Sequence, residues 1–250
     1  GDTGLRGWMR TTRPATDPSN LHRVMPAEGG MRVTRAAIVL AGGDPVAPQV
    51  KTQLPDDAVV IAADSGLHQA GPLGLHVDYV VGDLDSADPD AVERAQDAGA
   101  VVERHPPDKD ATDLELALDR ARAVGAQQVT VVGGTGGRLD HFVANVMLLA
   151  SARFADLAID ARLSAAYVAV AHGARPPHVI DGTPGSLLTL LPAGGDAIGI
   201  TTTGLQYPLH DATLRPGTTR GVSNLLVDAA GSVLLQHGTL LVIQPSGGAA

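Results

Sequence analysis

The feature that most constrains the fold is an alternation of short apolar runs with longer segments of helical periodicity between residues 33 and 153. The apolar runs are residues 36–40, 59–63, 79–81, 101–103 and 129–132. Between them, residues 90–98, 113–124 and 141–154 place apolar side chains three and four positions apart, which is typical of amphipathic helices. Strands that alternate with helices in this way predict an α/β domain with a mostly parallel sheet.

The second half of the chain has a different pattern. After residue 153 the helical periodicity ends, and Gly, Pro and Asp turns separate short apolar runs at residues 167–171, 186–191 and 233–235. This pattern predicts antiparallel β structure, as a sandwich or barrel. We therefore expect a disordered leader over residues 1–30, an α/β domain over 31–175 and a C-terminal all-β sandwich domain over 176–250.

Composition excludes several classes of function. The chain has no cysteine, so any metal must be bound through oxygen or imidazole. A net charge of −9 argues against a nucleic-acid-binding protein, which needs many Lys and Arg side chains. No run of about 18 apolar residues suggests a membrane span. Residues 1–30 lack the apolar stretch of a secretory signal, so we expect a cytoplasmic protein.

Four polar clusters follow the predicted strands, at the edge where open α/β sheets bind ligands. They are residues 63–66, 82–86, 108–113 and 133–141. In the second cluster, Asp83 and Asp85 are two positions apart, so both carboxylates would point the same way from an extended backbone. Oxygen ligands of this kind suit Mg²⁺. The alternative is a polar turn in which Ser86 or Asp88 caps the next helix.

The third cluster places acidic residues beside a predicted helix start. Thr112 is a plausible N-cap, and Glu115 three positions later would complete a capping box. Asp110 and Asp113 flank that cap, where acids also suit the helix dipole, so a structural role and a site role both remain open. Asp119, six residues after Asp113, is expected on the solvated face of the helix.

The fourth cluster has glycines at four of the positions 133–137, between a predicted strand and a predicted helix. Backbone N–H groups in such a loop can bind phosphate. The loop lacks the Lys-Ser/Thr ending of a Walker motif and the spacing of a dinucleotide fingerprint. Arg138 can supply positive charge, while Asp140 can reach a metal or cap the helix. Asp64 and Ser65 end the second strand, before a glycine that permits close approach of a ligand.

Taken in this order, the clusters resemble the thiamine pyrophosphokinase family. The family pattern runs Asp-x-Gly, Gly-Asp-x-Asp-Ser, Asp-x-Thr-Asp and Gly-x-x-Gly-Gly-Arg-x-Asp-His, and further similarity lies at residues 203–209, 221–224 and 238–243. The resemblance implies an α/β nucleotide- and metal-binding catalytic domain and a β-sandwich for thiamine binding and dimerisation. It also implies a homodimer, with each site between one subunit's α/β domain and its partner's β-domain.

The same resemblance implies an activity: transfer of diphosphate from ATP to the hydroxyethyl group of thiamine, giving thiamine diphosphate and AMP, with Mg²⁺. It assigns the metal to Asp83, Asp85 and Asp113, and catalysis to these three with Asp140. The implied nucleotide contacts are Asp64, Ser65, Asp110, Thr112, Gly136, Gly137 and Arg138, and the implied thiamine contacts are Ser223 and Asn224. The alternatives are a diphosphokinase for another heterocycle, such as a hydroxymethylpterin, and a non-catalytic thiamine- or nucleotide-binding regulator.

One departure from the family concerns packing on the thiamine rings. Some members place a tryptophan near the closing strand, but residues 240–243 are aliphatic here and the only tryptophan is Trp8. Aliphatic residues, Tyr207 or Phe142 must then contact the rings. The alternative for Tyr207 is an ordinary half-buried strand residue.

Overall fold

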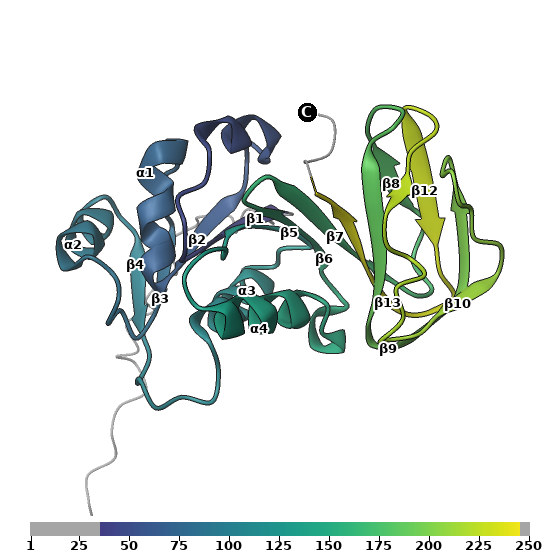
Figure 1. The fold of residues 1–250 in the computed structure, drawn as a ribbon. Helices are drawn as coiled ribbons and strands as arrows, with labels where there is room; N and C mark the ends of the chain where they lie inside the picture. The colour runs from purple at the N-terminus through teal and green to yellow at the C-terminus, as the bar shows by residue number, and fades with distance from the viewer. Residues whose placement is uncertain (1–35, 246–250) are drawn as a thin grey trace, which may run out of the picture. The chain divides into compact units, whose positions relative to one another are not determined.

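The computed structural model describes residues 36–245, so the predicted leader at residues 1–30 lies outside the described part of the chain. The N-terminal portion of the described chain contains six strands that pair in parallel, in the order β4-β3-β2-β1-β5-β6 (Figure 1). They are β1 Ala36–Ala41, β2 Val59–Ala63, β3 Tyr79–Gly82, β4 Val101–Arg104, β5 Gln128–Gly133 and β6 Ala158–Leu163. The predicted parallel sheet is therefore confirmed.

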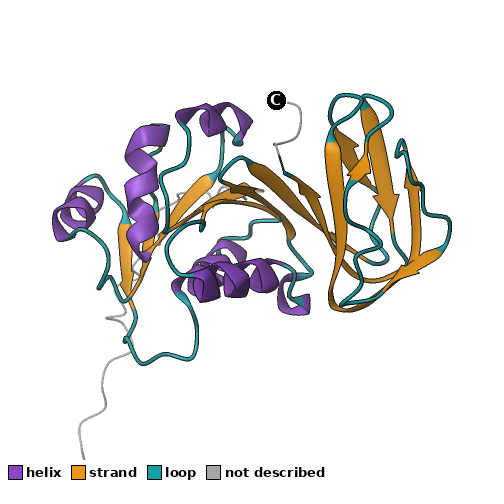
Figure 2. Ribbon diagram, in the orientation of Figure 1, coloured by secondary structure: helices purple, strands orange, loops and turns teal. Residues whose placement is uncertain are grey.

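Helices cover both faces of this sheet, which explains why its strands are apolar on both sides (Figure 2). Alternate residues of β1 enter different cores: Val39 packs in one and Leu40 in the other. The first core is completed by α3 Asp113–Ala123 and α4 Leu139–Leu149, together with the 3₁₀ turn η4 Ala152–Phe154. The second is completed by η2 Pro48–Gln53, η3 Asp64–Gln69, α1 Ala70–Leu73 and α2 Pro89–Asp97.

Two helix ends follow from local hydrogen bonding. Asp88 caps α2, because its carboxylate accepts a hydrogen bond of 3.1 Å from the backbone N–H of Asp90. The helix predicted over residues 141–154 is shorter, and α4 ends at Leu149. Ala150 leaves helical geometry at ψ 5°, and the Ser151 side chain then accepts a hydrogen bond from the Arg153 N–H and begins η4.

The remaining strands are antiparallel. They are β7 Ala166–His172, β8 His178–Asp181, β9 Leu187–Thr203, β10 Ala212–Leu214, β11 Asn224–Leu225, β12 Ala230–Leu234 and β13 His237–Gln244. β7 pairs with β6 on one side and with β13 on the other, and β13 pairs with β9. β9 is 17 residues long, and its later part pairs with β10 and β12. Hydrogen bonding is therefore continuous from the parallel strands into a β-rich C-terminal part, which has its own apolar core.

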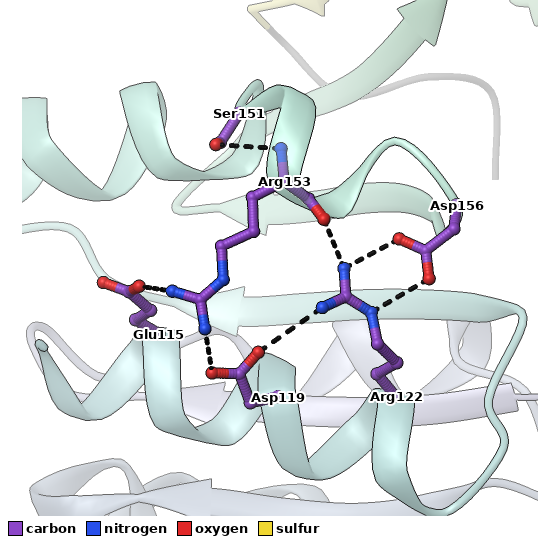
Figure 3. Close-up of polar contacts among 6 residues, drawn as sticks. All are labelled: Glu115, Asp119, Arg122, Ser151, Arg153 and Asp156. Carbon is purple, nitrogen blue, oxygen red and sulfur yellow. Dashed lines mark hydrogen bonds and ion pairs between the residues drawn. The ribbon is translucent and has the colours of Figure 1, made fainter.

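An ion-pair network joins α3 to the segment around η4 (Figure 3). Arg153 pairs with Glu115 and Asp119, while Arg122 donates two hydrogen bonds, of 2.9 and 2.7 Å, to the carboxylate of Asp156. Both guanidinium groups lie over the ring of Phe154, at 4.8 Å for Arg122 and 5.3 Å for Arg153.

The network corrects two sequence expectations. Glu115 does not complete a capping box, because its carboxylate bonds to Arg153, although the Thr112 side chain does accept a hydrogen bond of 3.3 Å from the Glu115 N–H. Asp119 is not a freely solvated residue, since it pairs with two arginines and is only 35% exposed. No helix within residues 36–245 is long and apolar enough to cross a membrane.

Candidate active site

The polar clusters predicted from sequence meet at one cavity of about 560 Å³, beyond the carboxyl ends of β1, β2, β3 and β5. All the residues that line it lie between positions 41 and 145. Of the predicted site residues, the lining includes Asp64, Ser65, Asp83, Asp85, Thr112, Asp113, Gly136, Gly137 and Arg138. Asp110 and Asp140 are exposed and are not part of this lining.

Three carboxylates form the closest acidic group at the cavity. Asp64, Asp83 and Asp85 each offer one oxygen, and these oxygens lie within 4.8 Å of one another. This group differs from the predicted metal set in one member, since Asp64 joins Asp83 and Asp85 while Asp113 lies beside them. Glycine at position 82 permits this crowding, because a Cβ there would lie 2.9 Å from Asp113 Oδ1 and 3.1 Å from Asp64 Cβ.

The backbone between Asp83 and Asp85 is not extended, contrary to the sequence argument. Leu84 has a φ of 62°, a left-handed conformation that a bulky residue rarely adopts. The chain therefore turns, and the Asp85 N–H donates a hydrogen bond of 3.3 Å to Asp83 Oδ1. Strained backbone of this kind is concentrated at functional sites. The two carboxylates converge through the turn and not through strand alternation.

Asp64 is suited to a cation. It is 6% exposed and has a φ of 48°, and its Oδ2 accepts a hydrogen bond from the Ser86 hydroxyl. Within the described residues, its buried Oδ1 has no hydrogen-bond partner. A buried carboxylate oxygen without a partner is costly, so it calls for a ligand. Together with the oxygens of Asp83 and Asp85, it makes the oxygen-rich donor set that a divalent cation such as Mg²⁺ prefers.

Lys109 is a site residue that the sequence reasoning missed. Its ammonium nitrogen lies 2.8 Å from Asp83 Oδ2 and 2.9 Å from Asp113 Oδ1, and its side chain is only 12% exposed. The first contact is a hydrogen bond, while the second is an ion pair. A lysine between two aspartates, Asp108 and Asp110, was the available signal, but the sequence does not say toward which carboxylates its side chain turns.

The charges in this group shift one another's pKa values. The hydrogen bond from Lys109 lowers the pKa of Asp83, while Asp83 itself raises the pKa of the neighbouring Asp85. Partial burial acts to lower the pKa of Lys109, but its contacts with Asp83 and Asp113 outweigh burial and raise that pKa. Lys109 is therefore a cation within the acidic group at neutral pH.

Two glycine-containing loops form another wall of the cavity. The Gly134 N–H donates to Gly42 O at 2.9 Å, and the Asp44 N–H donates to Thr135 O at 2.7 Å. At Gly136, with a φ of 83°, a Cβ would lie 2.2 Å from the Asp44 carboxylate. Only glycine allows the loops to approach this closely, and their backbone dipoles make such a wall suitable for phosphate.

Gln69 fixes the first of these loops and was also missed from sequence. It is 1% exposed, its Oε1 accepts a hydrogen bond of 3.1 Å from the Val46 N–H, and its Nε2 donates one of 3.0 Å to Asp44 O.

Arg138 lines the cavity but also bonds to Asp140 outside it. Two hydrogen bonds, of 3.1 and 2.6 Å, join the guanidinium to the carboxylate, and both side chains are largely exposed. This contact lowers the pKa of Asp140 to about 2. Asp140 is therefore an anion at neutral pH.

We expect the substitution Arg138→Gln to return the pKa of Asp140 toward the ordinary value of 3.8, because the hydrogen bonds from Arg138 are the largest cause of the shift. Carboxyl ¹³C chemical shifts, followed through an acid titration, would measure this. An unchanged Asp140 titration in the variant would mean that Arg138 is not the cause.

The two predicted thiamine contacts lie in the β-rich part. Ser223 is exposed, with a φ of 60°, and its N–H donates a hydrogen bond of 3.2 Å to Thr189 Oγ1. Asn224 is 7% exposed, and its amide brackets the backbone of Tyr207: Oδ1 accepts from the Tyr207 N–H at 3.0 Å and Nδ2 donates to Tyr207 O at 2.8 Å. Tyr207 lies in a bend and is 62% exposed, so it is not a half-buried strand residue.

Comparisons with known proteins agree with this arrangement. Residues 50–160 match the family model "Thiamin pyrophosphokinase, catalytic domain", and residues 177–240 match "Thiamin pyrophosphokinase, vitamin B1 binding domain". Thiamine pyrophosphokinase of Bacillus subtilis is 27% identical over 210 residues, which cover 83% of this chain and 96% of that protein.

Two solved structures show the same fold over the same share of the chain. The crystal structure of the Bacillus subtilis thiamine pyrophosphokinase has a TM-score of 0.72 at 25% identity, covering 84% of this chain and 98% of that one. The structure of thiamin pyrophosphokinase from Geobacillus thermodenitrificans has a TM-score of 0.70 at 26% identity, covering 84% and 96%. Both family models match in order, and the acidic cavity lies mainly within the segment that matches the catalytic model. The chain therefore belongs to the thiamine pyrophosphokinase family.

Proposed function

We propose that this chain is an ATP-dependent diphosphotransferase that converts thiamine to thiamine diphosphate, with release of AMP. The observation that carries the proposal is the meeting of three carboxylates, a lysine and two glycine-containing loops around one cavity, in a chain that matches both domains of the family. The match to a vitamin B1 binding domain favours thiamine over a hydroxymethylpterin. The dense acidic group favours an enzyme over a non-catalytic regulator.

The reaction requires the thiamine hydroxyl to attack the β-phosphorus of ATP while AMP leaves on the opposite side. Positioning and neutralisation of charge dominate such chemistry. The glycine-loop N–H groups and Arg138 would hold phosphate oxygens, since both face the cavity. Ser65 and Thr112 border the same space and would contact the nucleotide. One carboxylate of the acidic group would accept the hydroxyl proton.

The acidic group would hold Mg²⁺. Asp64, Asp83 and Asp85 would supply the closest oxygens, with Asp113 beside them. A cation bound there would neutralise negative charge on the phosphate chain. Asp110 and Asp140 would act from the rim of the cavity, because both side chains are exposed and lie outside its lining.

Thiamine would bind through the β-rich part of a partner subunit in a homodimer. The cavity lining comes only from residues 41–145, so the β-rich part of the same chain contributes nothing to it. Exposed Ser223 and the exposed ring of Tyr207, whose backbone Asn224 holds, offer a polar contact and a flat apolar face. A cytoplasmic location remains a prediction.

The function is tested by incubating the protein with ATP, Mg²⁺ and either thiamine or a hydroxymethylpterin, and by measuring AMP and the diphosphorylated product. We expect AMP and thiamine diphosphate in equal amounts with thiamine, and neither with the pterin. If AMP formed with the hydroxymethylpterin but not with thiamine, the pterin would be the substrate. If thiamine bound without turnover, the protein would be a regulator.

The shared site predicts complementation between two inactive subunits. We expect a heterodimer of an Asp85→Asn subunit and an Asn224→Ala subunit to recover about half of the activity per site pair, because one of its two composite sites has both intact halves. Activity per verified heterodimer is the measurement, and each variant homodimer is the control. Heterodimers as inactive as both homodimers would mean that each site is built within one subunit.

A further inference from the structure

The Lys109 ammonium contacts carboxylate oxygens of Asp83 and Asp113 at the place where a metal ion would bind. Asp83 belongs to the carboxylate group best placed to hold a cation, yet both of its oxygens are occupied: Oδ2 by the Lys109 ammonium at 2.8 Å and Oδ1 by the Asp85 N–H at 3.3 Å. A cation that takes an oxygen of Asp83 must displace one of these donors or share the oxygen with it. The ammonium is the donor that can move, because it is carried by a flexible four-carbon stem.

The surroundings of Lys109 offer a second binding position for its charge. Lys109 lies in the loop before α3, and its side chain lines the same cavity as Gly136, Gly137 and Arg138. Phosphate bound against those groups would present anionic oxygens to the same space. Lysine binds phosphate well as a point charge, so an ammonium displaced from Asp83 would have a partner there.

We propose that Lys109 is an internal counter-ion: its ammonium neutralises Asp83 and Asp113 before metal binds, a divalent cation displaces it, and it then binds the phosphate chain of ATP. The exchange avoids leaving the partly buried carboxylates of Asp83 and Asp113 without a cationic partner when no metal is bound, which would cost free energy. It also makes metal and nucleotide binding interdependent, because the charge released by one is used by the other. The phosphate step rests on the proposed function, whereas the metal step does not.

The chain is well suited to a direct test, because Lys51 and Lys109 are its only two lysines. With ¹⁵N-labelled lysine, an ammonium NMR signal is visible only when exchange with water is slow, as expected for a side chain that is 12% exposed and paired. We expect a Lys109 signal without metal, its loss when Mg²⁺ alone is added, and its return when the α,β-methylene analogue of ATP is added with Mg²⁺. A Lys109 signal that persists unchanged with Mg²⁺ would overturn the displacement.

Metal affinity gives a second readout that needs neither thiamine nor turnover. By calorimetric titration with Mn²⁺ alone, we expect Lys109→Gln to bind the metal about 10-fold more tightly than the unsubstituted protein, equivalent to about 1.4 kcal/mol. Lys109→Arg should bind it more weakly, because a guanidinium grips carboxylates in a bidentate manner. Lys51→Gln is the matched control, because Lys51 is exposed on η2 outside the cavity lining. Its Mn²⁺ affinity should equal that of the unsubstituted protein.

Two Lys109 variants are made so that one can be titrated if the other fails to fold. Thermal melting without metal checks folding, and Lys109→Arg retains the positive charge if Lys109→Gln proves unstable. Equal Mn²⁺ affinity in the unsubstituted protein and in a folded Lys109 variant would overturn the competition. If Mg²⁺ displaced the Lys109 ammonium but the protein made no thiamine diphosphate, the counter-ion role would stand and the proposed function would be wrong.

Discussion

An Asp85→Asn protein should fold normally and lose at least about 100-fold in turnover, equivalent to about 2.7 kcal/mol of activation free energy. Asp85 is exposed, and Asp83 raises its pKa, so removal of its charge relieves repulsion within the acidic group. The fold therefore does not depend on this carboxylate. Turnover should depend on it, because its oxygen is one of the three that lie within 4.8 Å of one another.

The rates are best measured at saturating ATP and thiamine across a titration of Mg²⁺. A weakened metal site should be partly rescued by more metal, whereas a lost proton acceptor should not be. Asp97→Asn is a suitable control, because Asp97 is exposed at the end of α2 and is not part of the cavity lining. Asp119 is unsuitable, since its ion pairs with Arg153 and Arg122 add a structural effect. Equal small effects at Asp85 and Asp97 would remove the acidic group from the mechanism.

A Phe154→Ala protein should be about 3–5 kcal/mol less stable toward unfolding, the usual cost of deleting a buried phenylalanine ring. Phe154 is completely buried in the core beneath α3 and α4. The guanidinium groups of Arg122 and Arg153 also lie over its ring, so the substitution removes the ring contacts of both arginines in the ion-pair network. A loss of this size is a large fraction of the total stability of a typical domain.

Urea unfolding followed by circular dichroism would measure the Phe154 effect. Phe154→Leu should cost under about 1.5 kcal/mol, because it keeps much of the apolar volume. Phe142→Ala is a second comparison, since Phe142 is only partly buried at the edge of the same core, and it should cost less than Phe154→Ala. If the free energy of unfolding of Phe154→Ala lay within about 1 kcal/mol of that of the unsubstituted chain, the core would have closed around the missing ring.

The sheet was predictable from sequence because its strands are short apolar runs buried on both faces. The run at residues 59–63 coincides with β2, and those at 36–40 and 129–132 lie within β1 and β5. The positions of the site residues followed from the sheet, since the carboxyl ends of parallel strands share one edge. Helix ends were less predictable, because α4 ends where Ser151 forms a local hydrogen bond and not where apolar periodicity fades.

Side-chain direction was the part that the sequence did not contain. Asp83 and Asp85 converge because Leu84 adopts a left-handed conformation, which alternation along a strand does not predict. Lys109 turns toward Asp83, which is 26 residues away along the chain, and Gln69 bonds to Asp44, which is 25 residues away. Such contacts depend on tertiary packing, so a motif can identify which residues gather at a site without saying which of them bond to one another.

The continuous pairing of β6, β7, β13 and β9 bears on how this protein can be divided. A cut at the predicted boundary after residue 175 would separate β7 from β13 and leave each half with a newly bare row of backbone N–H and C=O groups. Bare edges of this kind recruit other strands and promote aggregation. Although two family models divide the chain, the halves should be produced as one polypeptide, because the seam between them is itself part of a sheet.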